Sequence, residues 1–345
     1  MHVPSRRSRR PALLALTGLI LAGLVAVLVP GAAPARAPLP VYGAHNDVST
    51  PFNVAHIPTL RRTRFDGGSL RVRARLWETP GHRKHRISYR SAGRRVTGVI
   101  SIPQGAGPFP VLVAAHGYAD TRTYVSGRGL EREHAYLADA GYVVVETDYR
   151  NHGGSGREAR GRTVPRPRGY AEDLINLVRA LRAARLPYVD TGRLALLGRS
   201  MGGGVVLNAL AARPRLADAV VLYSPLSARA ADNYRRFVVG RAGHRRLARQ
   251  VRAAYGTPRT RPAFWRQISA SSYLHRIRVP VQIHHGLADD VTLARWSRRT
   301  ARRLADLGTP VDLRLYPGED HRFSTGWSEF IHATRTFLDD NLGRA

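Results

Sequence analysis

Short apolar runs that are typical of β-strands alternate with helical stretches from residue 85 to the end of the chain. The runs that predict strands cover residues 87–90, 96–102, 111–115, 142–147, 194–197, 219–223, 281–284 and 312–316. Apolar residues at helical spacing mark residues 171–185, 205–212, 296–307 and 327–341. This alternation predicts an α/β fold with a mostly parallel central sheet and helices on both of its faces.

One polar, arginine-rich stretch, residues 226–278, interrupts the alternation. Because it lies between two predicted strands, we expect it to form a small helical cap inserted into the domain. Its aromatic residues include Phe264 and Trp265. We expect these two side chains to bind substrate by shaping the pocket beneath the cap.

The stretch before the alternating region, residues 36–84, is rich in Pro, Gly and Arg and contains one predicted strand near residues 70–78. We interpret it as an N-terminal extension that lies on a main domain of residues 85–345. Residues 36–84 are too short to form a β-propeller.

The first 35 residues have the pattern of an export signal. Four arginines among residues 6–10 precede an uncharged apolar run over residues 12–29, and Ala33-Pro34-Ala35 offers a small-residue cleavage site. We therefore expect residues 1–35 to be a signal peptide and the protein to be secreted or otherwise extracytoplasmic. The alternative is a membrane anchor, because the apolar run just reaches the roughly 18 residues that span a bilayer.

The formal net charge of +31 comes almost entirely from arginine, because Lys84 is the only lysine. A bias toward arginine codons in a GC-rich genome is the simplest interpretation. The arginines are scattered in pairs and are not interleaved with aromatic residues as in single-strand binders, so we predict no specific nucleic-acid binding. A loose attraction to anionic wall polymers or a membrane surface stays a hypothesis.

The chain has no cysteine, which excludes disulfides, thiolate nucleophiles and thiolate zinc sites. His82 and His85 lie in an arginine-rich segment, and we expect no metal site there. Any covalent catalysis must therefore use a nucleophile other than a thiolate.

The pentapeptide Gly198-Arg199-Ser200-Met201-Gly202 directly follows the predicted strand at 194–197 and precedes a helical run. Strand, tight turn and helix form the context of a G-x-S-x-G nucleophile elbow. The flanking glycines allow a strained backbone that exposes the serine oxygen above the edge of the sheet. Ser200 is therefore the candidate nucleophile.

A serine hydroxyl needs a base to take its proton, and a carboxylate to orient that base. Asp289 follows the predicted strand at 281–284, and His321 follows the last predicted strand. The order Ser200, Asp289, His321 is the one expected of an α/β-hydrolase, with each residue at the carboxyl end of a strand. Asp290 is the competing acid. We interpret the neighbouring acids Glu319 and Asp320 as loop residues.

An oxyanion hole requires two backbone N–H groups that point to the position where the carbonyl oxygen gains charge. We expect one from Met201, the residue after the nucleophile, and the other from Tyr118 in the loop that follows the strand at 111–115. We interpret the remaining histidines as structural. His284 and His285 would support the acid loop, and His152 would brace the loop after Asp148.

These motifs resemble those of α/β-hydrolases of the prolyl oligopeptidase (S9) type, and they are similar to dienelactone-hydrolase-like and acetyl-xylan-esterase-like enzymes. The matching pieces are residues 116–118, 148–153, 198–203, 285–289 and 320–323. The resemblance implies Ser200 as nucleophile, Asp289 as acid, His321 as base, and the amides of Tyr118 and Met201 as the oxyanion hole. These are the roles that the residues themselves suggest.

We therefore expect an exported serine hydrolase that needs no cofactor and cleaves a short peptide or a small-molecule ester through an acyl-enzyme. Two departures from the family favour the alternative of a carboxylesterase, acting on acetyl esters or lactones, without peptidase activity. Family oligopeptidases carry an N-terminal β-propeller, and Met201 is more similar to the residue found in esterases and lipases. A remote alternative is a non-catalytic protein that keeps the fold and binds the cell wall.

Overall fold

A computed structural model describes residues 52–158 and 168–343. All of these residues belong to the unit Leu39–Ala345. The expected signal peptide at residues 1–35 lies outside the described residues. Among the described residues, no helix has the length and apolar character needed to cross a membrane.

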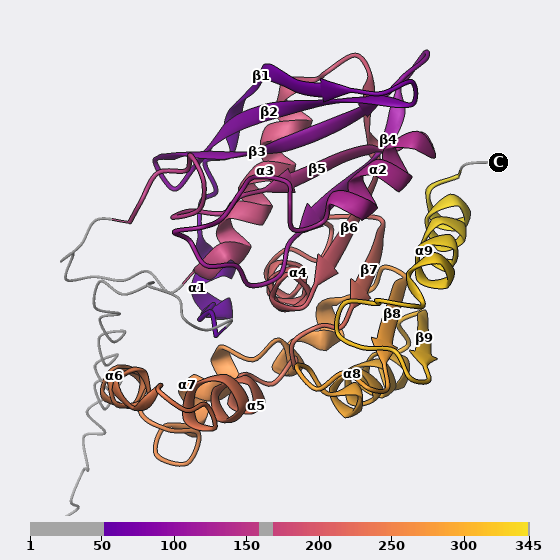
Figure 1. The fold of residues 1–345 in the computed structure, drawn as a ribbon. Coiled ribbons are helices and arrows are strands. Elements are labelled where there is room, and N and C mark those ends of the chain that lie inside the picture. The colour runs from indigo at the N-terminus through magenta and orange to yellow at the C-terminus, as the bar shows by residue number, and fades with distance from the viewer. Residues whose placement is uncertain (1–51, 159–167, 344–345) are drawn as a thin grey trace, which may run out of the picture. The chain divides into compact units, whose positions relative to one another are not determined.

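A single sheet runs through this unit, with its strands in the order β1-β2-β3-β5-β4-β6-β7-β8-β9 (Figure 1). Its antiparallel edge consists of β1 (Gly68–Glu78), β2 (His82–Ser91) and β3 (Arg94–Pro103). The parallel strands are β4 (Phe109–Ala115), β5 (Val143–Thr147), β6 (Val189–Arg199), β7 (Ala219–Tyr223), β8 (Val281–Gly286) and β9 (Val311–Tyr316). Each predicted strand of the main domain is present, and the predicted α/β architecture, a mostly parallel sheet with helices on both faces, is confirmed.

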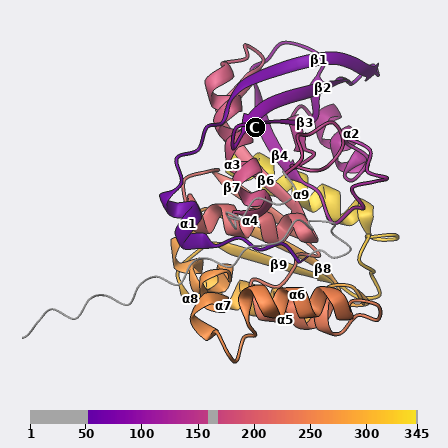
Figure 2. The same ribbon diagram turned by 90° about the vertical axis from the view of Figure 1, so that its left-hand side faces the viewer.

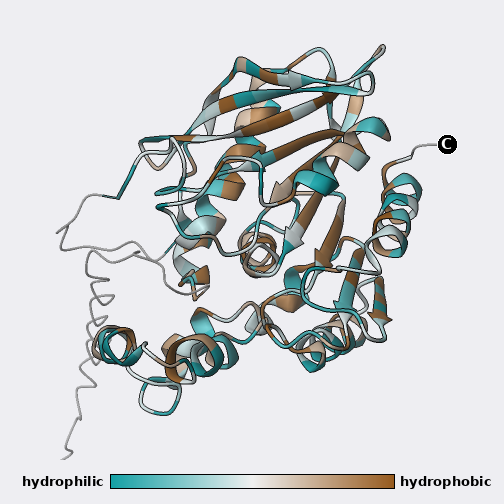
Figure 3. Cartoon of the chain, viewed as in Figure 1, coloured by the Kyte–Doolittle hydropathy of each residue, from teal (hydrophilic) through white to brown (hydrophobic). Residues whose placement is uncertain are grey.

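Helices cover both faces because the central strands are apolar on both sides. Val111 and Val113 of β4 face the helices α3 (Gly169–Ala184), α4 (Met201–Ala212) and α8 (Ala294–Asp306), together with the short α1 (Ile57–Arg62). Leu112 and Ala114 of the same strand face α2 (Glu131–Asp139) and α9 (Trp327–Leu342). This alternation follows from the two-residue period of a strand. Figure 3 shows the hydrophobic residues concentrated in these central strands.

The predicted cap is present between β7 and β8. It consists of α5 (Ala230–Tyr234), the π-helix η1 (Arg235–Val239), α6 (Arg245–Tyr255), α7 (Pro262–Gln267) and the 3₁₀ turns η2 (Ala270–Ser272) and η3 (Leu274–Arg276). In both views α5, α6 and α7 lie together, outside the sheet (Figures 1 and 2). The cap has a small core of its own, which includes Tyr234, Val251, Tyr255 and Trp265.

The segment interpreted as an extension is partly built into the sheet. β1 pairs with β2 in antiparallel fashion and forms the edge of the sheet, so residues 68–84 belong to the hydrolase sheet instead of lying on it. The expected boundary between residues 84 and 85 falls inside β2. The sequence obscured this arrangement because an edge strand exposes polar residues on both faces, and β1 is half arginine and small residues.

Candidate active site

Ser200 sits at a sharp turn between β6 and α4. Its backbone adopts φ 53° and ψ −116°, a conformation that L-residues rarely occupy. A Cβ atom at Gly198 would lie 2.7 Å from the Cα of Gly203, and one at Gly202 would overlap the carbonyl oxygen of Ala115. Both glycines of the G-x-S-x-G motif are therefore required by close backbone approach.

We expect Gly202→Ala to destabilise the fold by about 1–3 kcal/mol, because the new methyl group meets backbone instead of a side chain that could rotate away. Chemical denaturation measures this loss, and hydrolysis should fall with it because β4 would be displaced from the elbow. Gly204→Ala is the matched control, since its Cβ would lie an ordinary 3.4 Å from Leu226. Equal stability of the two variants would contradict this account of the elbow.

Three side chains from separate loops meet above the carboxyl ends of the parallel strands. The Ser200 hydroxyl lies 3.0 Å from His321 Nε2, within hydrogen-bond reach of the base. On the other side of the ring, His321 Nδ1 lies 2.8 Å from Asp289 Oδ2. The structure thus brings together the three residues that sequence reasoning selected, with the base between the nucleophile and the carboxylate that orients it.

Asp289 is held by more than the histidine. Its Oδ1 accepts the backbone N–H groups of Val291 and Thr292 at 2.8 and 2.9 Å, and its Oδ2 accepts the Thr292 hydroxyl at 2.8 Å. His285 Nε2 lies 3.3 Å from the same Oδ2. Burial by itself would raise the pKa of Asp289, but the hydrogen bonds from His285, His321 and Thr292 outweigh it and hold that pKa well below its usual range.

The competing acids are placed elsewhere. Asp290 is exposed, whereas Asp289 is buried. Glu319 accepts hydrogen bonds from the backbone of Asp320 and Gly326, and Asp320 accepts the N–H of Arg322 at 2.8 Å. These two acids therefore hold the shape of the loop that carries His321.

Sequence reasoning missed Thr292, which lies between the acid and the base. Besides its bonds to Asp289, its hydroxyl donates to the Ser224 carbonyl at 3.0 Å and lies 3.3 Å from His321 Nδ1. An acid whose side chain accepts backbone N–H groups two and three residues later forms an Asx-type turn. The pattern Asp-x-x-Thr at 289–292 is the signal that could have identified it.

The loop after β4 packs against the elbow. A Cβ atom at Gly117 would lie 3.3 Å from the Cβ of Ser200, so Tyr118 follows a residue in contact with the candidate nucleophile. Met201 is the first residue of α4, where a backbone N–H has no partner within the helix. The structure thus places the residue before Tyr118 in contact with Ser200, and the oxyanion hole at the amides of Tyr118 and Met201 stays a prediction.

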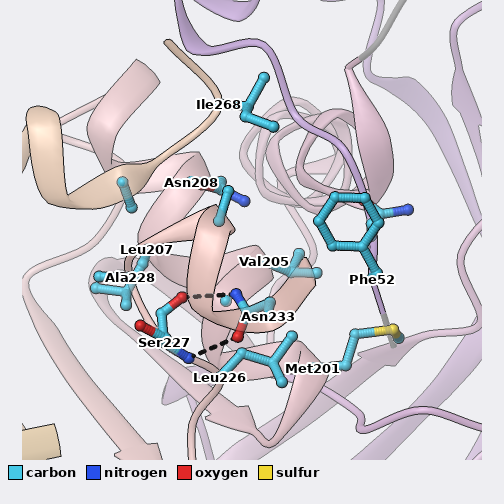
Figure 4. A pocket seen from close by; sticks show the side chains of 14 residues that line it. Phe52, Met201, Val205, Leu207, Asn208, Leu226, Ser227, Ala228, Asn233 and Ile268 are labelled. Carbon is cyan, nitrogen blue, oxygen red and sulfur yellow. Dashed lines mark hydrogen bonds between the residues drawn. The ribbon is translucent and has the colours of Figure 1, made fainter. Parts of the chain in front are cut away.

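A pocket of about 30 Å³ lies between α4 and the first residues of the cap (Figure 4). The Leu226 N–H at its wall donates to the Ser200 carbonyl at 3.0 Å, so the pocket adjoins the elbow. The side chain of Asn233 is fixed by two hydrogen bonds to the backbone of Ser227, at 2.8 and 3.1 Å. One water molecule needs a cavity of about 10–15 Å³, so the pocket has room for a group of two or three heavy atoms. Further lining residues include Phe52, Met201, Val205, Asn208 and Ile268.

Phe264 and Trp265 do not line this pocket. Trp265 is buried in the core of the cap, stacked on Phe52 with ring centroids 5.9 Å apart. Phe264 stacks on Tyr255 at 5.0 Å and on His56 at 6.1 Å. The expectation that these two side chains shape the pocket is corrected for this pocket: Trp265 packs on Phe52, and Phe52 lines it, whereas Phe264 packs on Tyr255 and His56.

The histidines interpreted as structural, and also His82, are buried in contacts within the fold. His82 Nδ1 lies 2.6 Å from Oδ1 of Asp139, a carboxylate 57 residues away in the chain. His284 contacts the Tyr316 hydroxyl at 2.7 Å, and His152 contacts the Arg150 carbonyl at 3.1 Å. Among the residues that the structure describes, no group of three or more His, Asp or Glu side chains is placed to hold a metal ion.

A cluster of buried ionisable side chains lies beside the loop that follows β4. Glu146, at the end of β5, is fully buried with its Oε2 3.1 Å from His134 Nε2. The loop at Gly129 packs against both Glu146 and His116, and Lys84 donates to the Gly127 carbonyl at 3.2 Å. Burial raises the pKa of Glu146 to about 7, although the charges of His116 and Lys84 oppose that rise.

Because folded Glu146 keeps its proton up to a pKa of about 7 and the unfolded chain releases it near 4.5, the folded state binds more protons between these values. The free energy of unfolding should therefore fall as the pH rises through this window, by about 3 kcal/mol from this group. Glu146→Gln should remove that fall. Chemical denaturation at pH 5 and pH 8 measures it, and parallel pH profiles for both proteins would contradict the assignment.

Comparison with known proteins places this chain in a family. The model of the prolyl oligopeptidase family matches residues 128–343. A curated relative, an Escherichia coli protein named uncharacterized 31.7 kDa protein in the traX-finO intergenic region, is 31% identical over 115 residues. That match covers 33% of this chain and 37% of the relative, so the chain spans little more than a third of that relative's length.

Two solved structures extend the likeness across the fold. Acetyl xylan esterase 1 from Thermoanaerobacterium sp. JW/SL YS485 has a TM-score of 0.60 at 18% identity, over 82% of this chain and 90% of that chain. The acylaminoacyl peptidase of Pyrococcus horikoshii has the same TM-score and identity, over 77% of this chain and 43% of that chain. The family resemblance expected from the motifs and the predicted α/β-hydrolase fold are therefore confirmed, and the chain belongs to the prolyl oligopeptidase family.

Proposed function

We propose that this protein is an exported serine hydrolase that cleaves ester or peptide bonds through an acyl-enzyme on Ser200. The observation that carries the proposal is the continuous set of contacts from Ser200 through His321 to Asp289, at 3.0 and 2.8 Å. The pattern of residues 1–35 supports export.

The first half of the reaction forms the acyl-enzyme. Ser200 Oγ attacks the substrate carbonyl carbon while His321 Nε2 takes the hydroxyl proton, and the buried Asp289 carboxylate stabilises the imidazolium. The carbonyl oxygen gains negative charge near the backbone N–H groups of Tyr118 and Met201. When the tetrahedral intermediate collapses, the bond to the alcohol or amine breaks, and His321 gives that leaving group the proton.

The second half reverses these roles with water. His321 Nε2 takes a proton from a water molecule as its oxygen attacks the acyl carbon. Collapse of the second intermediate breaks the bond to Ser200 Oγ and returns the proton to it, which releases the carboxylic acid. The chain's own side chains and backbone supply every group that this cycle needs.

The size of the pocket beside the elbow favours a second, narrower candidate. A free volume of about 30 Å³ suits a short acyl group better than a peptide side chain. A carboxylesterase for short acyl esters, without peptidase activity, is therefore the alternative. The neighbour named acetyl xylan esterase 1 makes acetyl esters the first class of substrate to test.

One assay separates the two candidates. The purified protein is given p-nitrophenyl acetate, p-nitrophenyl octanoate and an X-Pro p-nitroanilide, with Ser200→Ala as the control for each. Ser200-dependent turnover of the acetate, a slower octanoate and a silent anilide would establish the esterase. Comparable turnover of the anilide would establish a peptidase, and no Ser200-dependent turnover of any substrate would overturn the proposal.

A further inference from the structure

The exposed apolar side chains of this protein gather at one edge of the sheet. In the part of the chain that the structure describes, six large hydrophobic residues are exposed, and five of them lie on segments that leave the carboxyl ends of the parallel strands. These five, which we name the rim, are Tyr118, Val125, Val239, Leu287 and Val291. The sixth, Leu76, is on the edge strand β1.

Contacts place two segments of the rim around the candidate active site. The Val291 N–H donates to Asp289 at 2.8 Å, and Leu287 precedes that acid by two residues. Tyr118 follows the glycine that contacts Ser200. Val125 follows Tyr124, whose ring stacks on the ring of His116, in the same loop, at 4.8 Å.

The cap contacts the acid loop through the π-helix η1. The guanidinium of Arg236 in η1 donates to the backbone carbonyl of Asp290, which holds η1 to the acid loop. Val239 is the last residue of η1 and is 54% exposed. An exposed valine therefore lies three residues along the chain from the arginine that contacts the acid loop.

The cap is also far more basic than the rest of the chain. Residues 226–278 contain 13 arginines and a single acid, Asp232, whereas the remainder has 42 Lys and Arg residues for 23 acids. A bias toward arginine codons exchanges lysine for arginine, but it does not remove acidic residues. The acid deficit of the cap therefore requires a separate explanation.

Helix α6 presents much of this charge on one face. Arg245, Arg249 and Arg252 are exposed and recur at a spacing of four and three residues, while Val251 and Tyr255 are buried in the cap core. No acid among the described residues forms an ion pair with these three arginines. α6 packs against η1, the helix whose last residue is Val239 of the rim.

We propose that the rim and the basic face of α6 bind an anionic lipid surface, with the mouth of the active site turned toward it. Arginines pair with lipid phosphates, and apolar side chains enter the boundary between headgroups and acyl chains. A soluble polyanion would use the arginines but not the rim. This binding surface goes beyond the proposed hydrolysis, and it does not require turnover.

Sedimentation with lipid vesicles tests the surface. The full chain is mixed with vesicles of phosphatidylcholine alone or with one third phosphatidylglycerol, and the ratio of the two partition coefficients is the readout. Each arginine near an anionic surface contributes about fivefold, so the triple variant R245Q/R249Q/R252Q should lower this ratio by about 100-fold. The matched control, R71Q/R73Q/R86Q on β1 and β2, should leave it nearly unchanged.

The contribution of the apolar rim is tested by a second variant and its matched control. Val239→Asn should lower partition into anionic vesicles by about tenfold, and Leu76→Asn should not. Equal losses for the two arginine triples would overturn the proposal, since net charge alone would then explain binding. The same holds if Val239→Asn has no effect while R245Q/R249Q/R252Q loses binding to soluble polyphosphate, because the partner would then be a polymer.

A third measurement separates this proposal from the proposed hydrolysis. Turnover of water-soluble p-nitrophenyl acetate should be the same in R245Q/R249Q/R252Q as in the unaltered protein, because these arginines do not contact the triad. Loss of vesicle selectivity with intact turnover supports the lipid surface. If the unaltered protein shows no turnover but still prefers anionic vesicles, the proposed lipid-binding surface is supported and the proposed hydrolysis is contradicted.

Discussion

Ser200→Ala is expected to lower kcat for ester hydrolysis by a factor on the order of 10⁶. The substitution removes the hydroxyl oxygen that lies 3.0 Å from His321 Nε2, and with it the atom that would form the acyl bond. Steady-state kinetics measure the loss. A fluorophosphonate probe gives a second readout, since it should label the unaltered protein and not the variant.

Ser328→Ala serves as the control for this experiment. Ser328 is exposed on α9, away from the triad, and its replacement should change neither kcat nor probe labelling. Thermal denaturation of both variants tests whether the elbow still folds with alanine at φ 53°. Retained labelling in a folded Ser200→Ala protein would place the nucleophile elsewhere.

Asp289→Asn is expected to lower kcat by about 10⁴-fold. A carboxylate at this position accepts a hydrogen bond from the N–H group at Nδ1 of His321. Nε2 then carries no proton and can accept the proton of Ser200. An amide nitrogen there would donate to Nδ1 and favour the tautomer in which Nε2 already carries a proton. The hydrogen bonds from Thr292 and Val291 should keep the asparagine in place, so the loss should appear in kcat with the fold intact.

Asp290→Asn is the matched control, because it makes the same chemical change one residue later on an exposed side chain. It should leave kcat nearly unchanged. The reverse outcome, with Asp290→Asn inactive and Asp289→Asn active, would contradict the geometry of the acid loop.

The parts of the fold that the sequence predicted depend on local patterns. Apolar runs such as 111–115 and 219–223 gave strands because every residue in them is buried. The three residues of the candidate triad could be predicted for a similar reason. Each of them follows a strand, and the carboxyl ends of parallel strands meet at one edge of the sheet.

The parts that it did not predict depend on contacts between residues far apart in the chain. Trp265 faces Phe52, which is more than 200 residues away, and no local pattern distinguishes that partner from a bound substrate. His82 finds Asp139 only after β2 and α2 come together. Glu146 looks like an ordinary charged residue at the end of a strand, and only the packing of His134 and Gly129 around it reveals its burial.

The insertion point of the cap has an evolutionary consequence. Where residues 226–278 leave and re-enter the domain, β7 and β8 are already joined, by pairing of Tyr223 with His284 and by the Ser224 N–H bonded to the His284 carbonyl at 2.9 Å. The Thr292 hydroxyl adds a further bond to Ser224. The strands on either side of the insertion are thus held together by residues outside it. We therefore expect this insertion point to tolerate a module of another length or charge while Ser200, Asp289 and His321 keep their places.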